Sequence, residues 1–202
     1  MIRELQVRDA QRMREVIATA FKDDPLYVHN FKTDRERLTF VDFLVEKGFV
    51  QGETFLGYFE NERLIGVASL ELNIHKGGLK YLNARFLRLV WWLYSGIGGR
   101  AFAFFMRYKA FIDDVRPKGH HYYLVFIGVD PSARGKGVGG KIIEAIHRIV
   151  DADIEALGIA LDTENATNIP YYERFGYRVI AERSVGGVPI FAMLRVPSKE
   201  KA

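Results

Sequence analysis

The sequence predicts a single α/β domain in which helices flank a mixed β-sheet, and three features of the chain support this fold. Residues 122–129 are an uninterrupted apolar run, as expected for a strand buried on both faces. A glycine-rich turn, an amphipathic helical stretch and a second apolar run at 159–161 follow, which is the order of a right-handed βαβ crossover. Residues 54–59 and 64–72 predict an antiparallel hairpin with a tight turn.

The N-terminal part of the chain is predicted to be a short strand followed by two helices. Residues 2–7 alternate as a strand does, and Asp9 is placed to cap a helix that follows directly. The sequence Asp-Asp-Pro at 23–25 should break that helix. Apolar residues over 38–45 predict a second helix, which we expect to end near Gly48.

Residues 79–111 are predicted to be an aromatic-rich helical insertion. Arginines interrupt this segment, and no stretch of it is long and apolar enough for a membrane span, so integral membrane association is not expected. The sequence Ser-Gly-Ile-Gly-Gly at 95–99 predicts a break between two helices. We expect the aromatic side chains to pack in the core; a wall of a substrate pocket and an amphipathic surface contact are the alternatives.

The C-terminal part is predicted to complete the sheet. Apolar residues over 142–157 line one face of a helix that Gly158 should end, and Asn168 or Thr167 is placed to cap a short helix that follows the 159–161 strand. Two further strands should flank a glycine turn, and they are expected at 177–182 and 188–196. We therefore predict one domain over 1–202, with 122–196 as the half that carries the chemistry.

Composition excludes several classes of protein. The chain has no cysteine, which rules out disulfide frameworks and an acyl-cysteine mechanism. Its 29 basic and 25 acidic residues are too evenly balanced for a nucleic-acid-binding tract. The five histidines are scattered, so no metal site is expected. Residues 1–5 include the charged Arg3 and Glu4 and lack the apolar core of a secretory signal, which makes the cytoplasm the expected location.

A glycine-rich turn follows the 122–129 strand and predicts an anion-binding site. It reads Arg-Gly-Lys-Gly-Val-Gly-Gly-Lys over 134–141 and leads into the next helix. Such a turn directs unpaired backbone N–H groups and the positive end of the helix dipole into one small space. Glycine admits positive φ and lets a ligand approach the backbone closely. We therefore expect a phosphate group to bind at this turn.

Three phosphate-binding motifs fit this turn, and two of them fit it poorly. Gly135, Gly137 and Gly140 match the dinucleotide pattern GxGxxG, but a proline-containing segment separates them from the strand. The P-loop pattern GxxxxGK also matches, but Ile142 stands where a Ser or Thr hydroxyl should bind Mg²⁺. The third pattern, [QR]xxGx[GA], is matched by residues 134–139 directly after Val-Asp-Pro.

This third pattern resembles the acyl-CoA-binding signature of the GNAT superfamily of N-acetyltransferases. The stretch 168–177, Asn-Ile-Pro-Tyr-Tyr-Glu-Arg-Phe-Gly-Tyr, resembles the second signature of that family. A looser similarity to one branch of small GNAT enzymes lies at 20–25. Two signatures in the right order and at the right separation identify the chain as similar to GNAT proteins over about 122–196.

The resemblance implies a fold, a co-substrate and a set of site residues. The fold is a mostly antiparallel mixed sheet, flanked by helices, that splays between its two central parallel strands. The co-substrate is acetyl-CoA, held by strand amides and by the loop amides that bind the pyrophosphate. The residues implied to bind it are Ile127, Gly128, Val129, Arg134, Gly135, Lys136, Gly137, Val138, Gly139, Gly140, Asn168 and Tyr172.

Acyl transfer to an amine needs a site for the carbonyl oxygen, a neutral amine and an acid for the departing thiolate. Tyr172 matches the general acid of the family, and a phenol is protonated at neutral pH. The glutamate that some members carry early on the central strand is missing here. His121 is the candidate base in its place, with Glu71, Asp162 or a water relay as alternatives.

The leading hypothesis is an acetyl-CoA-dependent N-acetyltransferase that acts by direct transfer on an amine of a small molecule or a peptide. A noncatalytic acyl-CoA-binding sensor is the alternative, and a dinucleotide-dependent oxidoreductase is a third. We expect the acceptor pocket to be shaped by residues 24–31 and 79–111. The identity of the acceptor and the oligomeric state, a homodimer included, remain open at this stage.

Overall fold

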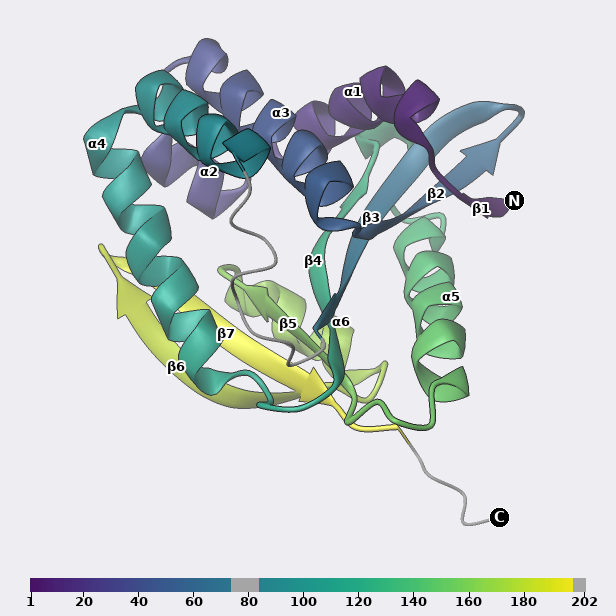
Figure 1. Ribbon diagram of the computed structural model, residues 1–202. Coiled ribbons are helices and arrows are strands. Elements are labelled where there is room, and N and C mark those ends of the chain that lie inside the picture. The colour runs from purple at the N-terminus through teal and green to yellow at the C-terminus, as the bar shows by residue number, and fades with distance from the viewer. Residues whose placement is uncertain (74–83, 198–202) are drawn as a thin grey trace.

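The computed structural model describes residues 1–73 and 84–197, and its centre is one mixed sheet of seven strands in the order β1-β2-β3-β4-β5-β7-β6 (Figure 1). The strands are β1 (Ile2–Glu4), β2 (Thr54–Glu60), β3 (Arg63–Asn73), β4 (His121–Val129), β5 (Ile159–Thr163), β6 (Arg178–Val185) and β7 (Val188–Arg195). The helices are α1 (Ala10–Ala20), α2 (Pro25–Asn30), α3 (Asp34–Gln51), α4 (Ala84–Val115), α5 (Val138–Ala152) and α6 (Ile169–Glu173).

Neighbouring strands in this sheet are antiparallel except for β4 and β5, which run parallel. Helix α5 connects β4 to β5, so the predicted βαβ unit is confirmed. The predicted hairpins are also confirmed: β2 and β3 meet at a turn with positive φ at Asn61 and Glu62, and β6 and β7 meet at Gly186-Gly187.

Helices cover both faces of the sheet, and each face has its own core. One core contains buried residues of α1, α2, α3 and α4, among them Ile17, Tyr27, Val41 and Phe104. The other lies under α5 and α6, and α5 contributes one buried stripe, which consists of Val138, Ile142, Ile143, Ile146 and Val150. Figure 1 shows α5 set apart from the group formed by α1, α3 and α4.

Helix α4 corresponds to the predicted insertion and is broken where the glycines predicted a break. Gly98 has φ 77° and ψ 163°, which divides the element into two helices. The inner face buries Leu93, Phe104 and Phe111 in the core, whereas Trp91 on the outer face is exposed. The expectation that the aromatic side chains pack in the core is therefore confirmed for the inner face. Residues 79–83 of the predicted insertion lie outside the described residues. In 1–73 and 84–197 no helix is long and apolar enough to cross a membrane.

The two parallel strands separate soon after they begin. Their register contains only two pairs, Tyr122 with Ile159 and Tyr123 with Ala160, although both strands continue beyond these residues. On its other side β4 stays paired with β3 as far as Val129, with one irregularity that leaves Val125 as an extra residue on β4. The splayed sheet that the family resemblance implied is therefore present.

Two predicted helix ends are wrong. Gly48 lies inside α3, where a Cβ would meet the Phe55 ring at 2.2 Å, so this glycine serves packing; the helix ends at Gly52, which is left-handed. Helix α5 ends at Ala152 instead of Gly158. The chain turns away there because the Asp153 carboxylate is held by Tyr122 and accepts the N–H of Glu155.

Two predicted caps are also wrong, and α2 was not expected. Asp9 stands directly before the first residue of α1, but its carboxylate pairs with Arg3 at 2.8 Å and accepts the Gln6 N–H instead of an N–H of α1. At the second predicted cap, neither Asn168 nor Thr167 caps through its side chain; the Asn165 side chain accepts the Thr167 N–H instead. Helix α2 begins because the side chain of Asp24 accepts two N–H groups, and Pro25 fits the first turn.

Candidate active site

The loop between β4 and α5 has the open glycine geometry that an anion-binding turn needs. Gly135 and Gly137 have φ of 77° and 74°, and no atom lies within 4 Å of the position where a Cβ would stand on either. Gly137 is the residue before the first turn of α5, whose N–H groups point out of the helix end. A phosphate can therefore approach the backbone of this loop closely.

The next two glycines lie against aromatic side chains of α6 and the residues after it. A Cβ on Gly139 would lie 2.8 Å from the Tyr171 hydroxyl, and one on Gly140 would lie 3.2 Å from the Phe175 ring. Val138 buries its side chain in the core, so only its backbone faces the loop. The sequence therefore located the loop correctly but did not separate its two kinds of glycine.

The basic residues of the loop are partly engaged by the protein itself. Arg134 donates to the Ala20 carbonyl at the end of α1 at 3.0 Å, and Lys136 lies 3.7 Å from Glu60. Lys141 lies over the Tyr58 ring and 3.3 Å from its hydroxyl. These side chains place positive charge around the loop, and the hydrogen bond of Arg134 also connects the loop to α1.

The free edge of β4 faces β5 beyond the point where the two strands separate. The Asp130 N–H bonds to Ile65 of β3, so by alternation the N–H groups of Val129 and Ile127 point toward the β5 side. Gly128 lies in regular register with Val67, and a Cβ there would meet Ala20 at 3.0 Å. Gly128 is therefore a close-approach glycine and not the site of the bulge.

Tyr172 lies on α6 with its side chain 8% exposed. Its ring packs in the α5-side core, and its hydroxyl makes no hydrogen bond to the described part of the chain. Burial raises the pKa of this phenol, and the neighbouring Tyr171, Glu164 and Asp162 raise it further. The group therefore remains protonated at neutral pH. Asn168 donates to Thr163 at the end of β5 at 3.2 Å, so it holds the approach to α6.

The structure does not bring His121 together with these residues. It is the first residue of β4, with 0% exposure, and its Nδ1 lies 2.7 Å from the Gly119 carbonyl. The glycine-rich loop follows the opposite end of the same strand. Glu71 is similarly engaged away from the loop, 3.8 Å from Arg116.

A group of acids that the sequence reading did not assemble lies where β5 ends. Glu164 follows β5 directly and accepts a hydrogen bond from the Tyr108 hydroxyl of α4. Burial, and then the charge of Asp24, raise the pKa of Glu164 to about 8. Burial also raises the pKa of Asp162, and the charge of the neighbouring Glu164 raises it further. A carboxylate directly after a buried parallel strand was the available signal, because such strand ends gather at one sheet edge.

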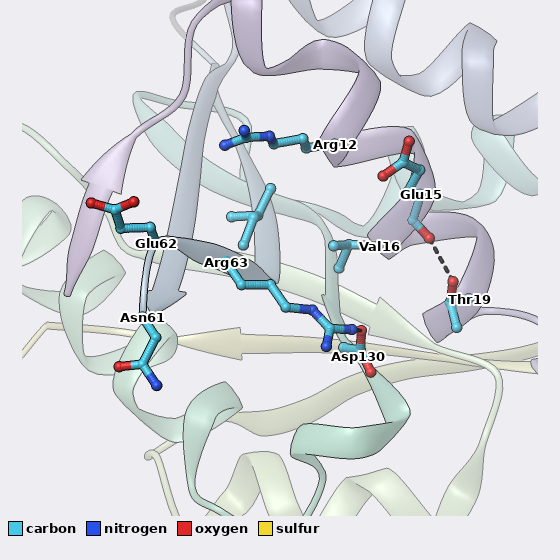
Figure 2. A pocket seen from close by; sticks show the side chains of 9 residues that line it. Arg12, Glu15, Val16, Thr19, Asn61, Glu62, Arg63 and Asp130 are labelled. Atoms are coloured by element: carbon cyan, nitrogen blue, oxygen red, sulfur yellow. Dashed lines mark hydrogen bonds and ion pairs between the residues drawn. The ribbon is translucent and has the colours of Figure 1, made fainter.

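A separate pocket of about 460 Å³ lies between α1 and the β2–β3 turn (Figure 2). Its charged residues include Arg63, which donates to Asp130 at 2.8 Å, and Arg12 on α1. None of the residues that the family resemblance assigns to binding or catalysis lines it. Among the described residues, no group of three or more His, Cys, Asp or Glu side chains could hold a metal ion.

Comparison with protein families agrees with the geometry of the loop and of the splayed strands. The model of the Acetyltransferase (GNAT) family matches residues 14–177, which is most of the chain. The chain belongs to the GNAT family. The resemblance seen in the two sequence signatures is therefore confirmed.

Curated relatives of this GNAT protein match it over a shorter stretch. An uncharacterized N-acetyltransferase of Schizosaccharomyces pombe is 38% identical over 85 residues, which are 40% of this chain and 34% of that protein. The mycothiol acetyltransferase of Propionibacterium freudenreichii is 36% identical over 78 residues, which are 38% of this chain and 24% of that protein. The match thus spans about a third or less of the length of these relatives.

Solved structures show the same fold over the whole GNAT chain. A histone acetyltransferase HPA2 and related acetyltransferase from Corynebacterium glutamicum aligns with a TM-score of 0.70 at 20% identity, covering 100% of this chain and 98% of that one. The PaiA N-acetyltransferase from Thermoplasma acidophilum, solved in complex with coenzyme A, aligns with a TM-score of 0.57 at 17% identity, covering 97% and 98%.

Proposed function

We propose that this protein is an N-acetyltransferase that transfers the acetyl group of acetyl-CoA directly to a primary amine of a small molecule or peptide. One arrangement carries the proposal: the free edge of β4 lies between an open glycine loop and a partly buried acid–tyrosine pair. The loop is represented by Gly135 and Gly137, and the pair consists of Glu164 and Tyr172. Membership of the GNAT family supports the same reaction.

The loop and strand fit the two ends of acetyl-CoA. The open positions at Gly135 and Gly137, with the first-turn amides of α5, would hold the pyrophosphate. The N–H groups of Ile127 and Val129 would hold the pantetheine and the thioester carbonyl. When bound, acetyl-CoA supplies an acetyl group activated as a thioester.

We assign the general base to Glu164 rather than to His121. Burial raises the pKa of both Glu164 and Asp162, and the pKa of Glu164 is raised to about 8 by burial and by the charge of Asp24. A base whose pKa lies near the working pH is suited to proton transfer. His121, at the start of β4 and wholly buried, is not needed for this step.

The general acid is Tyr172. Glu164 takes a proton from the acceptor ammonium, which frees the nitrogen lone pair to form the new C–N bond. As the C–S bond breaks, Tyr172 gives its proton to the sulfur and regains one from solvent. Of the two protons that remain on the acceptor nitrogen, the product amide keeps one and the other leaves to solvent. Glu164 also passes its proton to solvent, so one proton is released in each turnover. The positive charge of the acceptor offsets the carboxylates that raise the pKa of Tyr172, so acceptor binding strengthens the acid.

The test is release of free coenzyme A from acetyl-CoA in the presence of a panel of primary amines. Arg134→Glu places a negative charge at the loop, and we expect it to raise the KM for acetyl-CoA strongly. Arg148→Glu is the matched control, because Arg148 is exposed on a later turn of α5. Release that is absent with every amine, or equal in both variants, would contradict the proposal.

The alternative of a noncatalytic sensor was motivated by the missing strand glutamate. Glu164 supplies a carboxylate at the end of the neighbouring strand, so the missing glutamate is no longer an argument against catalysis.

A further inference from the structure

The acids at the end of β5 have no cationic partner among the described residues. Asp24, Asp162 and Glu164 form no ion pair within that part of the chain, although most other half-buried carboxylates there are paired, for example Asp42 with Arg14. A carboxylate that ionises away from water is costly unless a positive charge accompanies it. The missing cation therefore points to a ligand that carries one.

The described groups that interact with Glu164 come from five elements, and they are acids or phenols. Asp24 and Tyr27 lie at the start of α2, and Asp162 on β5. Tyr108 donates from α4, and the hydroxyls of Tyr123 on β4 and Tyr172 on α6 interact electrostatically with the same carboxylate. The one arginine over the Tyr123 ring, Arg116, is already paired, with Asp113 at 2.8 Å and Glu71 at 3.8 Å.

Tyr27 is a second observation that points to a ligand. Its side chain is 5% exposed, and its hydroxyl is buried and has no hydrogen-bond partner among the residues that the structure describes. The hydroxyl interacts with Asp24 and Glu164, so it faces the acidic group. Buried hydroxyls are normally hydrogen-bonded, and this one is free to accept an N–H of a ligand.

Aromatic side chains pack beside the acidic group. Phe21 stacks on Tyr27 with ring centroids 5.4 Å apart and meets Phe126 of β4 edge-on. Tyr108 lies 6.1 Å from Phe104 within α4. Aromatic faces attract organic cations, and together with carboxylates they repel anionic groups.

We infer that the acceptor is a primary amine that carries no carboxylate near its amino group. The inference rests on the proposed function and narrows it: the ammonium of the acceptor supplies the positive charge that Asp24, Asp162 and Glu164 lack. The α-carboxylate of an amino acid would lie against these acids, and none of the residues in 1–73 and 84–197 supplies an unpaired basic side chain beside them.

The experiment compares amines that differ only in a carboxylate. 2-Phenylethylamine is paired with phenylalanine, and 1,4-diaminobutane with ornithine, and kcat/KM is measured by coenzyme A release. We expect a preference of about tenfold or more for the carboxylate-free member of at least one pair, because like charges oppose the other member. Equal or better use of the amino acids would overturn the inference while leaving the proposed function intact.

A variant of Asp24 tests the effect of its charge while the fold is kept. Asp24→Asn keeps an oxygen that can cap α2, so we expect the helix to remain and the preference to shrink. Asp23→Asn is the control, because Asp23 is the exposed neighbour. A preference that is unchanged in Asp24→Asn removes Asp24 from the inference.

A binding readout separates this inference from the proposed function. With free coenzyme A present, the preferred amine should raise the melting temperature further and its carboxylate partner should not. If coenzyme A itself does not stabilise the protein and no amine is turned over, the proposed function fails, and the inference fails with it.

Discussion

At the scale of single residues, the proposed reaction assigns binding and proton transfer to different groups. Gly135 and Gly137 open the loop, whereas Arg134 anchors it to the end of α1. Tyr172 and Glu164 are the groups that can move protons, because burial and neighbouring charge place both pKa values above their ordinary range. Each of the two reacting groups can be tested by removing one atom or one charge.

Tyr172→Phe should abolish proton delivery without disturbing the fold. The ring stays in the core and the lost hydroxyl made no hydrogen bond to the described residues, so the melting temperature should hold. Loss of a general acid lowers kcat by about 10²–10⁴. Steady-state kinetics and coenzyme A binding check this. Tyr171→Phe, one residue earlier on α6, should leave kcat near the wild-type value; a matching loss there would remove the assignment.

Glu164 should give the reaction its pH dependence. The base must be ionised to accept a proton, so kcat/KM should rise with pH through the pKa of Glu164 at about 8. In Glu164→Gln the activity should be low and this rise should vanish. A pH profile of both proteins between pH 5 and about 10 tests the assignment, and an unchanged profile in the variant would contradict it.

The same group should affect stability with the opposite sense. Its pKa in the folded protein, about 8, is raised above the ordinary 4.5, so its contribution is fully present below that lower value and is lost as pH rises through the higher one. Glu164→Gln has no carboxyl group to ionise, so the variant does not lose this stability as pH rises. The free energy of unfolding of the variant, relative to wild type, should therefore increase between these two pH values, and denaturant titrations would show it.

At the scale of elements, the break in α4 places one side chain in the site. The helix before Gly98 packs on the core through Leu93 and Ile97, and the helix after it carries Tyr108 to Glu164. The sequence predicted the break from local glycines. It could not predict which side chain of the second helix would reach β5, because that depends on how α4 crosses the sheet.

Gly98→Ala should therefore cost both stability and activity. Its φ of 77° and ψ of 163° lie in a region that essentially only glycine occupies, and forcing alanine into it costs about 1–3 kcal/mol. Gly99→Ala is the control, since Gly99 is helical and a Cβ there meets nothing closer than 3.8 Å. That change should stabilise by up to about 1 kcal/mol. Urea unfolding distinguishes the two, and equal effects would show that the break is not strained.

At the scale of the whole molecule, the site depends on segments from both halves of the chain. Asp24 and Tyr108 belong to the two segments from which an acceptor pocket was expected, and Glu164 comes from the half that carries the chemistry. Ligand binding should therefore stabilise the whole fold rather than one part of it.

Coenzyme A should raise the melting temperature and NAD should not. At a concentration of about a hundredfold above Kd, a ligand stabilises the folded state by about 2.7 kcal/mol. For a chain of this size that corresponds to an increase of about 5–10 °C. Thermal melts with each ligand test this, and Arg134→Glu should reduce the coenzyme A effect. Stabilisation by NAD alone would favour the oxidoreductase reading of the glycine loop.

The sequence by itself determined the features that depend on residues close together along the chain. The hairpin turns, the glycine loop before α5 and the two family signatures are of this kind, because turn and strand preferences act over a few residues. The predicted helix ends were less accurate. Helix α5 ends before Gly158 because of the contacts of Asp153, and Gly48 lies inside α3, where it packs against Phe55.

Only the tertiary structure decided how the site is composed. Glu164 is an unremarkable carboxylate in the sequence, and it becomes a candidate base because burial and Asp24, far away along the chain, raise its pKa. His121 seemed suitable by residue type, yet β4 places it at the end remote from the loop. The physical reason is that desolvation and electrostatic coupling depend on distances in space, which the splay of β4 from β5 and the path of α4 establish.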